Sequence, residues 1–355
     1  MESIIKYPGG KEKELKFFEG FVPKTYANFY DPFVGGGSVW LSLDGEKCFI
    51  NDKSTELVCL YRYIQHQDSD FLESLSKIDD SLCELLSFVN GCGDGFLQEL
   101  YSKYRNREIN DDVLKSQISL FFQSEQTGVL KQFLPTNTFN KFKRMRKIEQ
   151  ERGYMPDEDI FSNIETIFMS SLYEYYRFLY NKNNCSEFER TALFVYLRNY
   201  AYSGMFRFNA KGDFNVPYGG MAYNHKTLSN KLKYYQSDEL LERFSRCEIE
   251  CLDFEEFLQL HTPSENDFVF LDPPYDSDFS TYDKNVFGHA EHERLANYLT
   301  NNCKAKWMLV IKSTPFITGL YENTDVNIRT FDKKYTVNFK NRNNQNAEHL
   351  IITNY

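Results

Sequence analysis

The chain has 355 residues, of which 41% are hydrophobic, 17% aromatic and 26% charged, and this composition excludes widespread disorder. The longest apolar runs, such as Trp307–Ile311, are too short to span a bilayer, and no basic and apolar leader opens the chain. A secreted or membrane protein is therefore disfavoured, and the length favours two domains or one domain with a large insertion.

The net charge of −10 conceals two basic stretches. Residues 131–148 carry six Lys and Arg side chains and no acid, and residues 196–235 carry six with one acid. Attraction to phosphates depends on such local patches rather than on the total charge. Each stretch is compatible with nucleic acid binding, although each could equally be the solvated face of a helix.

The first 55 residues have the pattern of a compact α/β unit. We expect short strands at Tyr26–Asp31 and Lys47–Ile50, with a short helix at Ser38–Leu43 between them. A longer helix is expected at Glu56–His66.

The character of the chain changes near residue 67. Residues 67–100 are acidic and contain a glycine break at Gly91–Gly95, and residues 160–180 place apolar side chains at helical spacing. The middle third is therefore predicted to be a mainly helical insertion. Residues 204–220 have a polar, glycine-rich centre between aromatic residues, which predicts a hairpin.

The α/β pattern returns near residue 247. Phe268–Leu271 and Trp307–Ile311 are fully apolar, as is typical of buried strands. His289–Cys303, between them, has one apolar helical face. Val326–Val337 and Glu348–Tyr355 are expected to be closing antiparallel strands.

The cysteines and histidines do not form a metal-binding pattern. The eight cysteines lack a CxxC pair, so we interpret them as reduced core thiols rather than disulfides or zinc ligands. The histidines show no HExxH or HxxxH spacing, and no metal is expected.

Two motifs near the expected strand ends indicate a cofactor that contains a nucleoside. The glycines of Asp31–Gly37 (DPFVGGG) allow a ligand to approach the backbone N–H groups closely, although a triple glycine alone is often only a turn. Asp52 ends the second strand, where an acid is placed to bind ribose hydroxyls, although an Asn-Asp turn is common there.

A third motif, Asp272-Pro273-Pro274-Tyr275, follows the apolar strand Phe268–Leu271. Two prolines end strand pairing and stiffen the backbone. The Asp272 carboxylate and the Pro273 carbonyl can each accept an N–H from a planar amine, and Tyr275 can stack on its ring. The alternative is a chance Pro-Pro turn.

These motifs occur in the order found in Dam-type DNA adenine-N6 methyltransferases, which the sequence resembles. The resemblance covers both ends and residues 195–225, and it is poor over residues 67–190. Ile5–Lys11 is similar to the family's K-W/Y-x-GGK motif, Asp31–Val39 to its glycine motif, and Asn51-Asp52 to the acidic end of its second strand. Gly204–Gly219 is similar to the G-x-x-R-x-N-x-x-G-x-FN-x-P-x-G signature, and Asp272–Tyr275 to the DPPY tetrapeptide. Asn341-Arg342 and Glu348–Tyr355 resemble the C-terminal ending of the family.

The resemblance implies an α/β fold: a Rossmann-like methyltransferase sheet with an inserted, mainly helical target-recognition domain and a β-hairpin. The catalytic domain would comprise residues 1–66 and 236–355, and the insertion residues 67–235 with the hairpin at 204–219. S-adenosyl-L-methionine (SAM) would be the cofactor, leaving S-adenosyl-L-homocysteine, and double-stranded DNA the partner. A methyl group would pass to N6 of an adenine flipped out of the duplex.

The resemblance also implies roles for individual residues. The cofactor contacts would be Tyr7, Lys11, Asp31, Gly35, Gly37, Asp52, Asp253 and Asp272. The catalytic residues would be Asp272, Pro273, Pro274 and Tyr275. The DNA contacts would be Tyr202, Ser203, Arg207, Asn209 and Lys211, with a core position as the alternative for Tyr202. The basic run Lys141–Lys147 is a further candidate phosphate contact.

Alternatives stay open at this point: an RNA adenine methyltransferase, or a catalytically inactive DNA-binding relative. Glutamine methyltransferases of related architecture resemble NPPY rather than DPPY, and no cysteine follows a proline as a cytosine-C5 enzyme would require. A nicotinamide oxidoreductase is disfavoured because GxGxxG is missing. We expect a monomeric, cytoplasmic bacterial or phage-encoded enzyme, acting alone or beside a separate restriction endonuclease.

Overall fold

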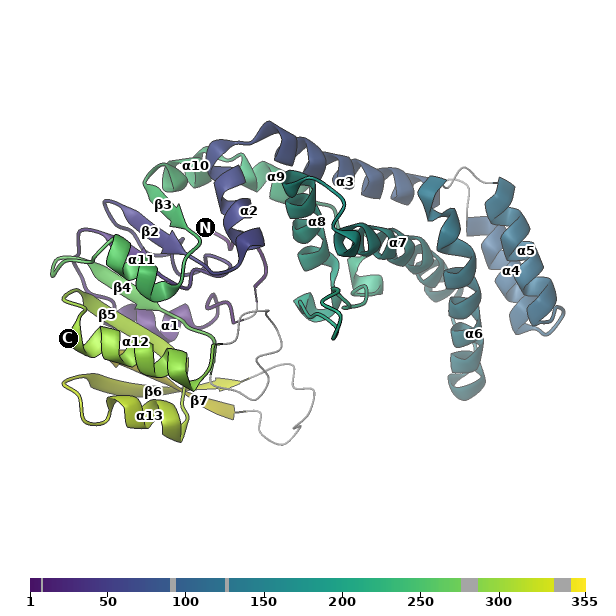
Figure 1. Ribbon diagram of the computed structural model, residues 1–355. Coiled ribbons are helices and arrows are strands. Elements are labelled where there is room, and N and C mark those ends of the chain that lie inside the picture. Colours follow the sequence, from purple (N-terminus) through teal and green to yellow (C-terminus); the bar gives the residue numbers. More distant parts are fainter. Residues whose placement is uncertain (8, 90–93, 125–127, 276–286, 335–345) are drawn as a thin grey trace. The chain divides into compact units, whose positions relative to one another are not determined.

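The computed structural model describes residues 1–7, 9–89, 94–124, 128–275, 287–334 and 346–355 (Figure 1). The chain forms two compact units. The sheet unit comprises Met1–Asp68 and Tyr235–Tyr355, and the helical unit comprises Ser69–Tyr234. The predicted mixed α/β class and Rossmann-like sheet are confirmed.

A seven-stranded sheet with the order β3-β2-β1-β4-β5-β7-β6 forms the centre of the sheet unit. Strands β1 to β5 are parallel, and β7 runs antiparallel to both β5 and β6. Ligands of open parallel sheets bind beyond the carboxyl ends of the strands, where the strand order reverses, which here is between β1 and β4. The strands are β1 Phe29–Asp31, β2 Cys48–Asn51, β3 Cys247–Glu250, β4 Phe268–Leu271, β5 Lys306–Lys312, β6 Asn327–Lys334 and β7 Asn346–Thr353.

Helices cover both faces of this sheet, because successive strand residues point to opposite sides. On β4, Leu271 joins the apolar cluster formed with α11 (Phe254–Leu260), α12 (His289–Asn301) and α13 (Pro315–Tyr321). On the other face, Phe18 of the short helix α1 (Leu15–Phe18) stacks on Phe270 with ring centroids 5.3 Å apart. The remaining helices of this unit are α2 (Thr55–His66), α10 (Asp238–Ser245) and the 3-10 turn Glu19–Phe21.

The described residues of the helical unit form six long helices, and α7 is central because it contacts α3, α4, α6 and α8. Apolar side chains are buried around much of α7, whereas a helix on a protein surface would bury one stripe. A capping box formed by Ser186 and Glu189 starts α8. The helices are α3 Ser69–Phe88, α4 Asp94–Arg105, α5 Asp111–Ser124, α6 Leu134–Arg152, α7 Asp157–Lys182, α8 Glu187–Tyr200 and the short α9 Ser229–Tyr235, with 3-10 turns at Gly128–Gln132, Tyr202–Gly204 and Met221–Tyr223.

The two ends of the inserted segment are tied together within the sheet unit. Gln67 ends α2 in the left-handed conformation, and its side-chain Nε2 donates to the carbonyls of Ile64, at 2.8 Å, and Tyr235, at 2.9 Å. The Tyr235 hydroxyl in turn donates to the Ile4 carbonyl at 2.8 Å. The segment therefore leaves and rejoins the sheet unit at one place.

One local prediction was wrong and one was met in part. Ser38–Leu43 forms turns rather than a helix. Gly37, with φ of +82°, precedes the segment, and the chain must return to β2 at Cys48, so only isolated helical bonds such as Leu41 N–H to the Gly37 carbonyl form. Residues 204–220 reverse direction as expected of a hairpin. Their antiparallel pairing is limited to isolated bridges between Ala201 and Tyr218 and between Phe208 and Phe214, so no regular strands form.

The helices expected at Glu56–His66, at 160–180 and at His289–Cys303 are confirmed. The strand that precedes the DPPY motif, Phe268–Leu271, and the C-terminal strand are confirmed as well. The first strand begins at Phe29, three residues later than expected. The glycine break, Cys92, Asn341-Arg342 and the end of Val326–Val337 lie wholly or partly outside the described residues. Among the described residues, Cys48, Cys83, Cys185, Cys247, Cys251 and Cys303 are free thiols.

Candidate active site

Lys11 joins the N-terminal motif to the DPPY segment. Its side chain is 1% exposed, and Nζ lies 2.6 Å from Oδ1 of Asp272 and donates to the Tyr275 hydroxyl at 2.8 Å and to the Gly9 carbonyl at 3.1 Å. Glu14 lies 3.8 Å away. A buried ammonium needs such compensation, because removing a charge from water costs several kcal/mol. The ion pair therefore fixes Asp272 and the hydroxyl of Tyr275.

Asp31 ends β1 beside this cluster and is fully buried. Burial raises the pKa of its carboxyl well above the usual range, the N–H of Phe33 and the ammonium of Lys11 lower the pKa, and the charges of Asp272 and Asp52 raise it further. The carboxyl group of Asp31 therefore keeps its proton to a higher pH than an exposed aspartate does.

The glycine loop, Tyr7 and Asp52 come together at the ends of β1 and β2. The Gly35 N–H donates to Oδ2 of Asp52 at 3.1 Å, and the Tyr61 hydroxyl donates to the Gly35 carbonyl at 2.6 Å. A Cβ placed on Gly35 would lie 3.3 Å from Cδ1 of Tyr7, so the tyrosine ring packs against the loop. The loop backbone and the Asp52 carboxylate are thus both held in place.

Gly36 is the tightest point of the loop. A Cβ there would lie 2.6 Å from the Ile5 carbonyl oxygen, which is closer than real Cβ contacts come. The next glycine, Gly37, has a φ of +82°, a conformation that favours glycine. These glycines allow the N-terminal motif to lie against the loop.

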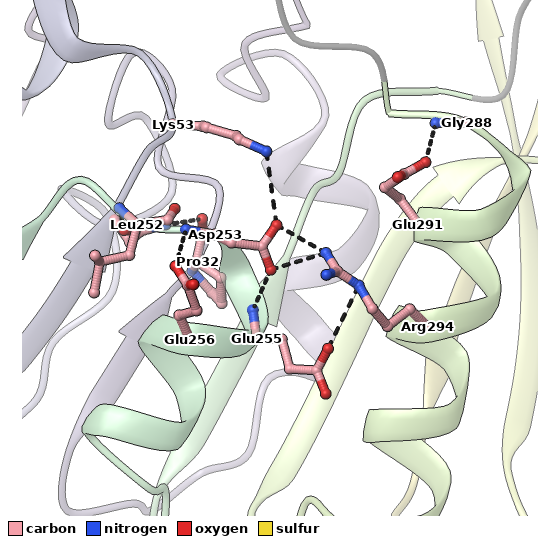
Figure 2. Close-up of polar contacts among 10 residues, drawn as sticks. Pro32, Lys53, Leu252, Asp253, Glu255, Glu256, Gly288, Glu291 and Arg294 are labelled. Atoms are coloured by element: carbon pink, nitrogen blue, oxygen red, sulfur yellow. Dashed lines mark hydrogen bonds and ion pairs between the residues drawn. The ribbon is translucent and has the colours of Figure 1, made fainter.

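Asp253 caps α11 and is held by basic side chains, as Figure 2 shows. Its carboxylate accepts the Glu255 N–H at 3.1 Å. Each of its two oxygens lies 2.8 Å from Nη2 of Arg294, and one lies 3.7 Å from Nζ of Lys53. The preceding Leu252 N–H donates to Asn51 Oδ1 at 2.8 Å, which anchors this corner to the end of β2.

The predicted DNA-contacting residues lie in the helical unit, in and just before residues 204–219, which we call the recognition segment. Tyr202 is 45% exposed, so its alternative placement in the core is wrong. Ser203 has a φ of 54°, and the exposed Arg207 reaches Asn215 Oδ1 at 3.5 Å. Asn209 lies in a tight turn, and its side-chain Oδ1 accepts the Lys211 N–H at 2.9 Å.

The basic run on α6 divides into paired and exposed side chains. Lys143 lies 3.2 Å and Arg146 3.5 Å from Asp111 of α5, and the Arg146 guanidinium lies 3.8 Å from the centroid of the Tyr104 ring. Arg144 and Lys147 are exposed. Part of the run therefore holds α5 against α6, and three of its cations, Lys143, Arg144 and Lys147, are exposed.

A family model for D12 class N6 adenine-specific DNA methyltransferases matches residues 7–156 and 137–337. The chain belongs to this family. The family resemblance drawn from the motifs and the prediction of an adenine-specific DNA methyltransferase are confirmed.

One viral and one archaeal relative are similar to this D12 class chain along its whole length. It is 28% identical over 367 residues to the Type II methyltransferase M.CviBI of Paramecium bursaria Chlorella virus NC1A, covering 100% of both chains. It is 25% identical over 373 residues to the Type II methyltransferase M.MjaIII of Methanocaldococcus jannaschii, covering 100% of this chain and 99% of the relative. The DNA adenine methylase of Salmonella typhi is 25% identical over 305 residues, which cover 84% of this chain and 76% of the relative.

Sequence reasoning placed Lys11 and Asp272 in the site of this D12 class enzyme but did not foresee that they pair directly. It also missed Arg294 and Lys53, which hold Asp253, because nothing in their local sequence marks them. Among the described residues, no three His, Cys, Asp or Glu side chains gather as metal ligands. Within the same residues, no helix combines the length and apolar character needed to cross a membrane.

Proposed function

We propose that this D12 class enzyme transfers the methyl group of SAM directly to N6 of an adenine flipped out of double-stranded DNA. The observation that carries the proposal is the Lys11–Asp272–Tyr275 cluster, which presents a fixed carboxylate and an aromatic ring at the end of β4. This cluster lies where the sheet reverses its strand order, next to the glycine loop that follows β1.

The residues beside the cluster suit SAM. Asp52 ends a strand next to the glycine loop, the position from which an acid binds ribose in related α/β sheets. Tyr7 and Gly35 would pack against the cofactor, and Lys11 and Asp31 would lie near its methionine end. SAM supplies an electrophilic methyl group when bound.

The chain's own residues would prepare the attacking nitrogen. Asp272 and the Pro273 carbonyl accept hydrogen bonds from the adenine N6 amino group, which draws the nitrogen lone pair out of conjugation with the ring. Tyr275 stacks on the flipped base, which offsets the few kcal/mol lost on unstacking. Alignment of the two reactants contributes about 7–11 kcal/mol, and no strong base is needed because the methylated nitrogen loses its proton afterwards.

The recognition segment supports contact with DNA from the helical unit. Tyr202 and Ser203 precede it, and Arg207, Asn209 and Lys211 lie on it. The exposed guanidinium of Arg207 suits a base edge or a phosphate. The names of the Type II relatives support a role as a modification enzyme beside a separate endonuclease, and we infer a monomer.

The test is methyl transfer from labelled SAM to unmethylated duplex DNA, followed by separation of the nucleosides. Label should appear in N6-methyladenine only. Label in RNA but not in DNA would support an RNA enzyme instead, and absence of SAM binding would contradict the proposal.

Reversing the charges of Arg144 and Lys147 on α6 should weaken DNA binding without regard to sequence. In Arg144→Glu/Lys147→Glu, affinity should fall alike on unrelated duplexes, and the slope of log K against log salt should become shallower by about 0.9 per lost phosphate contact. Fluorescence anisotropy over a salt series measures both. Lys77→Glu/Lys103→Glu changes the net charge equally at exposed sites on α3 and α4, and it is the control. Equal behaviour of the two double variants would reject a phosphate contact by α6.

The role of Asp253 is tested by Asp253→Ser, which keeps a helix cap but removes the carboxylate. If the carboxylate binds the cofactor, SAM affinity should fall about 10-fold or more, because hydrogen bonds to charged groups contribute about 1.5–3 kcal/mol. Calorimetric titration with SAM gives the affinity, and thermal unfolding monitors the cap. Unchanged affinity would limit Asp253 to capping α11 and holding Arg294.

A further inference from the structure

Aromatic rings from four separate segments form a continuous row within the sheet unit. The rings of Phe17 on α1 and Phe331 on β6 stack at 5.1 Å, and Phe331 meets His349 on β7 at 5.4 Å. His349 then contacts the ring of Tyr275 edge-on, with centroids 5.4 Å apart and planes at 69°. The row therefore ends on the aromatic residue of the DPPY motif.

His349 is unusual in its position on β7. It is fully buried, and the residues that follow it, Leu350, Ile351 and Ile352, are apolar core residues. Its neighbours across the sheet are Phe331 on β6 and Lys312 on β5, so the strand register fixes where the imidazole lies. Edge-to-face packing is a favoured geometry for ring pairs, and it restricts the tilt of the tyrosine ring.

Tyr275 is restrained from two directions. Nζ of Lys11 donates to its hydroxyl at 2.8 Å and lies 5.1 Å from the ring centroid, and His349 packs against the ring. The same Lys11 Nζ lies 2.6 Å from Asp272, so the orientation of the tyrosine and the position of the carboxylate are coupled.

We propose that His349 is a positioning residue for methyl transfer: it holds the ring of Tyr275 and, through the tyrosine hydroxyl, the Lys11–Asp272 pair. The inference rests on the proposed function, in which Tyr275 stacks on the target adenine. His349 acts through Tyr275 and need not touch the cofactor or the DNA, so its loss should affect the transfer step rather than binding.

Three variants test this role. His349→Ala removes the ring, His349→Phe restores a flat ring, and Ile351→Ala is the matched control, because Ile351 is equally buried on β7 but belongs to no ring contact with Tyr275. In single-turnover assays His349→Ala should slow methyl transfer about 10-fold or more, since small misplacements of reacting groups are costly. The dissociation constants for SAM and for duplex DNA should change little. His349→Phe should recover most of the rate, and Ile351→Ala should lower the melting temperature without slowing transfer at a temperature where it is folded.

A second measurement does not depend on activity. With 3-fluorotyrosine incorporated only at position 275, the ¹⁹F resonance should move or broaden in His349→Ala and stay in place in Ile351→Ala. An unmoved resonance would overturn the inference, as would a normal transfer rate in folded His349→Ala. If the unaltered enzyme methylates no DNA, the proposed function fails, and the ¹⁹F spectra still decide whether His349 holds Tyr275.

Discussion

Asp272→Ala should slow the formation of N6-methyladenine by about 100-fold to 1,000-fold. This is the effect of removing one preorganised hydrogen-bonding group from an active site. The alanine can accept no hydrogen bond from the adenine amino group, so the nitrogen keeps its lone pair in the ring system. The measurement is labelled methyl transfer under single-turnover conditions, with SAM affinity determined in parallel. Comparing the two shows whether the loss arises in cofactor binding or in the transfer step.

Two further variants, Asp272→Asn and Asp325→Ala, separate a loss of catalysis from a loss of stability. Asp272→Ala leaves the Lys11 ammonium buried without its partner, so it should also lower the melting temperature. Asp272→Asn keeps the shape and one acceptor, and should be less destabilised yet still slow. Asp325→Ala removes an exposed carboxylate from the same unit and should leave the transfer rate unchanged. A folded Asp272→Ala enzyme with a normal rate would refute the catalytic role.

Gly36→Ala should disable the cofactor loop. The added Cβ would lie 2.6 Å from the Ile5 carbonyl and 3.2 Å from Cβ of Tyr7, and a backbone atom cannot move aside as a flexible side chain can. Relief of the clash must push the N-terminal motif away from the loop, and overpacking of this kind costs about 1–3 kcal/mol. We therefore expect a lower melting temperature and SAM affinity weakened by about 10-fold or more.

Gly319→Ala is the matched control for this substitution. Gly319 lies within α13, and a Cβ there would meet no atom within 4 Å. Alanine is favoured over glycine in a helix interior by about 1 kcal/mol, so this variant should be as stable as the parent or more stable, with normal SAM affinity. Normal cofactor binding by Gly36→Ala would show that the loop has room that the structure does not indicate.

Local sequence predicted the strand β4 and the helix α12 well, because apolar runs and helical periodicity act over a few residues. The DPPY motif could be placed at a strand end for the same reason. The helix predicted at Ser38–Leu43 does not form, because the positive φ of Gly37 and the short path to β2 override the helical preference of this segment. For residues 204–220 the pattern correctly predicted the reversal of the chain, but it could not show that the antiparallel pairing would stay limited to isolated bridges.

Contacts between distant segments could not be predicted from one sequence. Lys11 and Asp272 are far apart in the chain. They lie 2.6 Å apart because the N-terminal motif packs on the glycine loop after β1, through Ile4 N–H to the Gly36 carbonyl and Lys11 N–H to Ser38 Oγ, and because β1 pairs with β4. The same is true of Arg294, which reaches Asp253 from another helix, and of His349, which meets Tyr275 through the register of β7. A motif indicates which residues carry the chemistry, whereas the residues that hold them are visible only in the fold.

The hydrogen bond from Gln67 to the Tyr235 carbonyl has an evolutionary consequence. Because the inserted segment leaves and returns at one place, residues can be added to it or removed from it without stretching any strand of the sheet. The helical unit can therefore gain or lose residues without displacing the strand ends that carry the proposed methyl-transfer residues. The family model matches residues 7–156 and 137–337, so the family resemblance extends through residues 67–190, where the motifs alone had indicated a poor match.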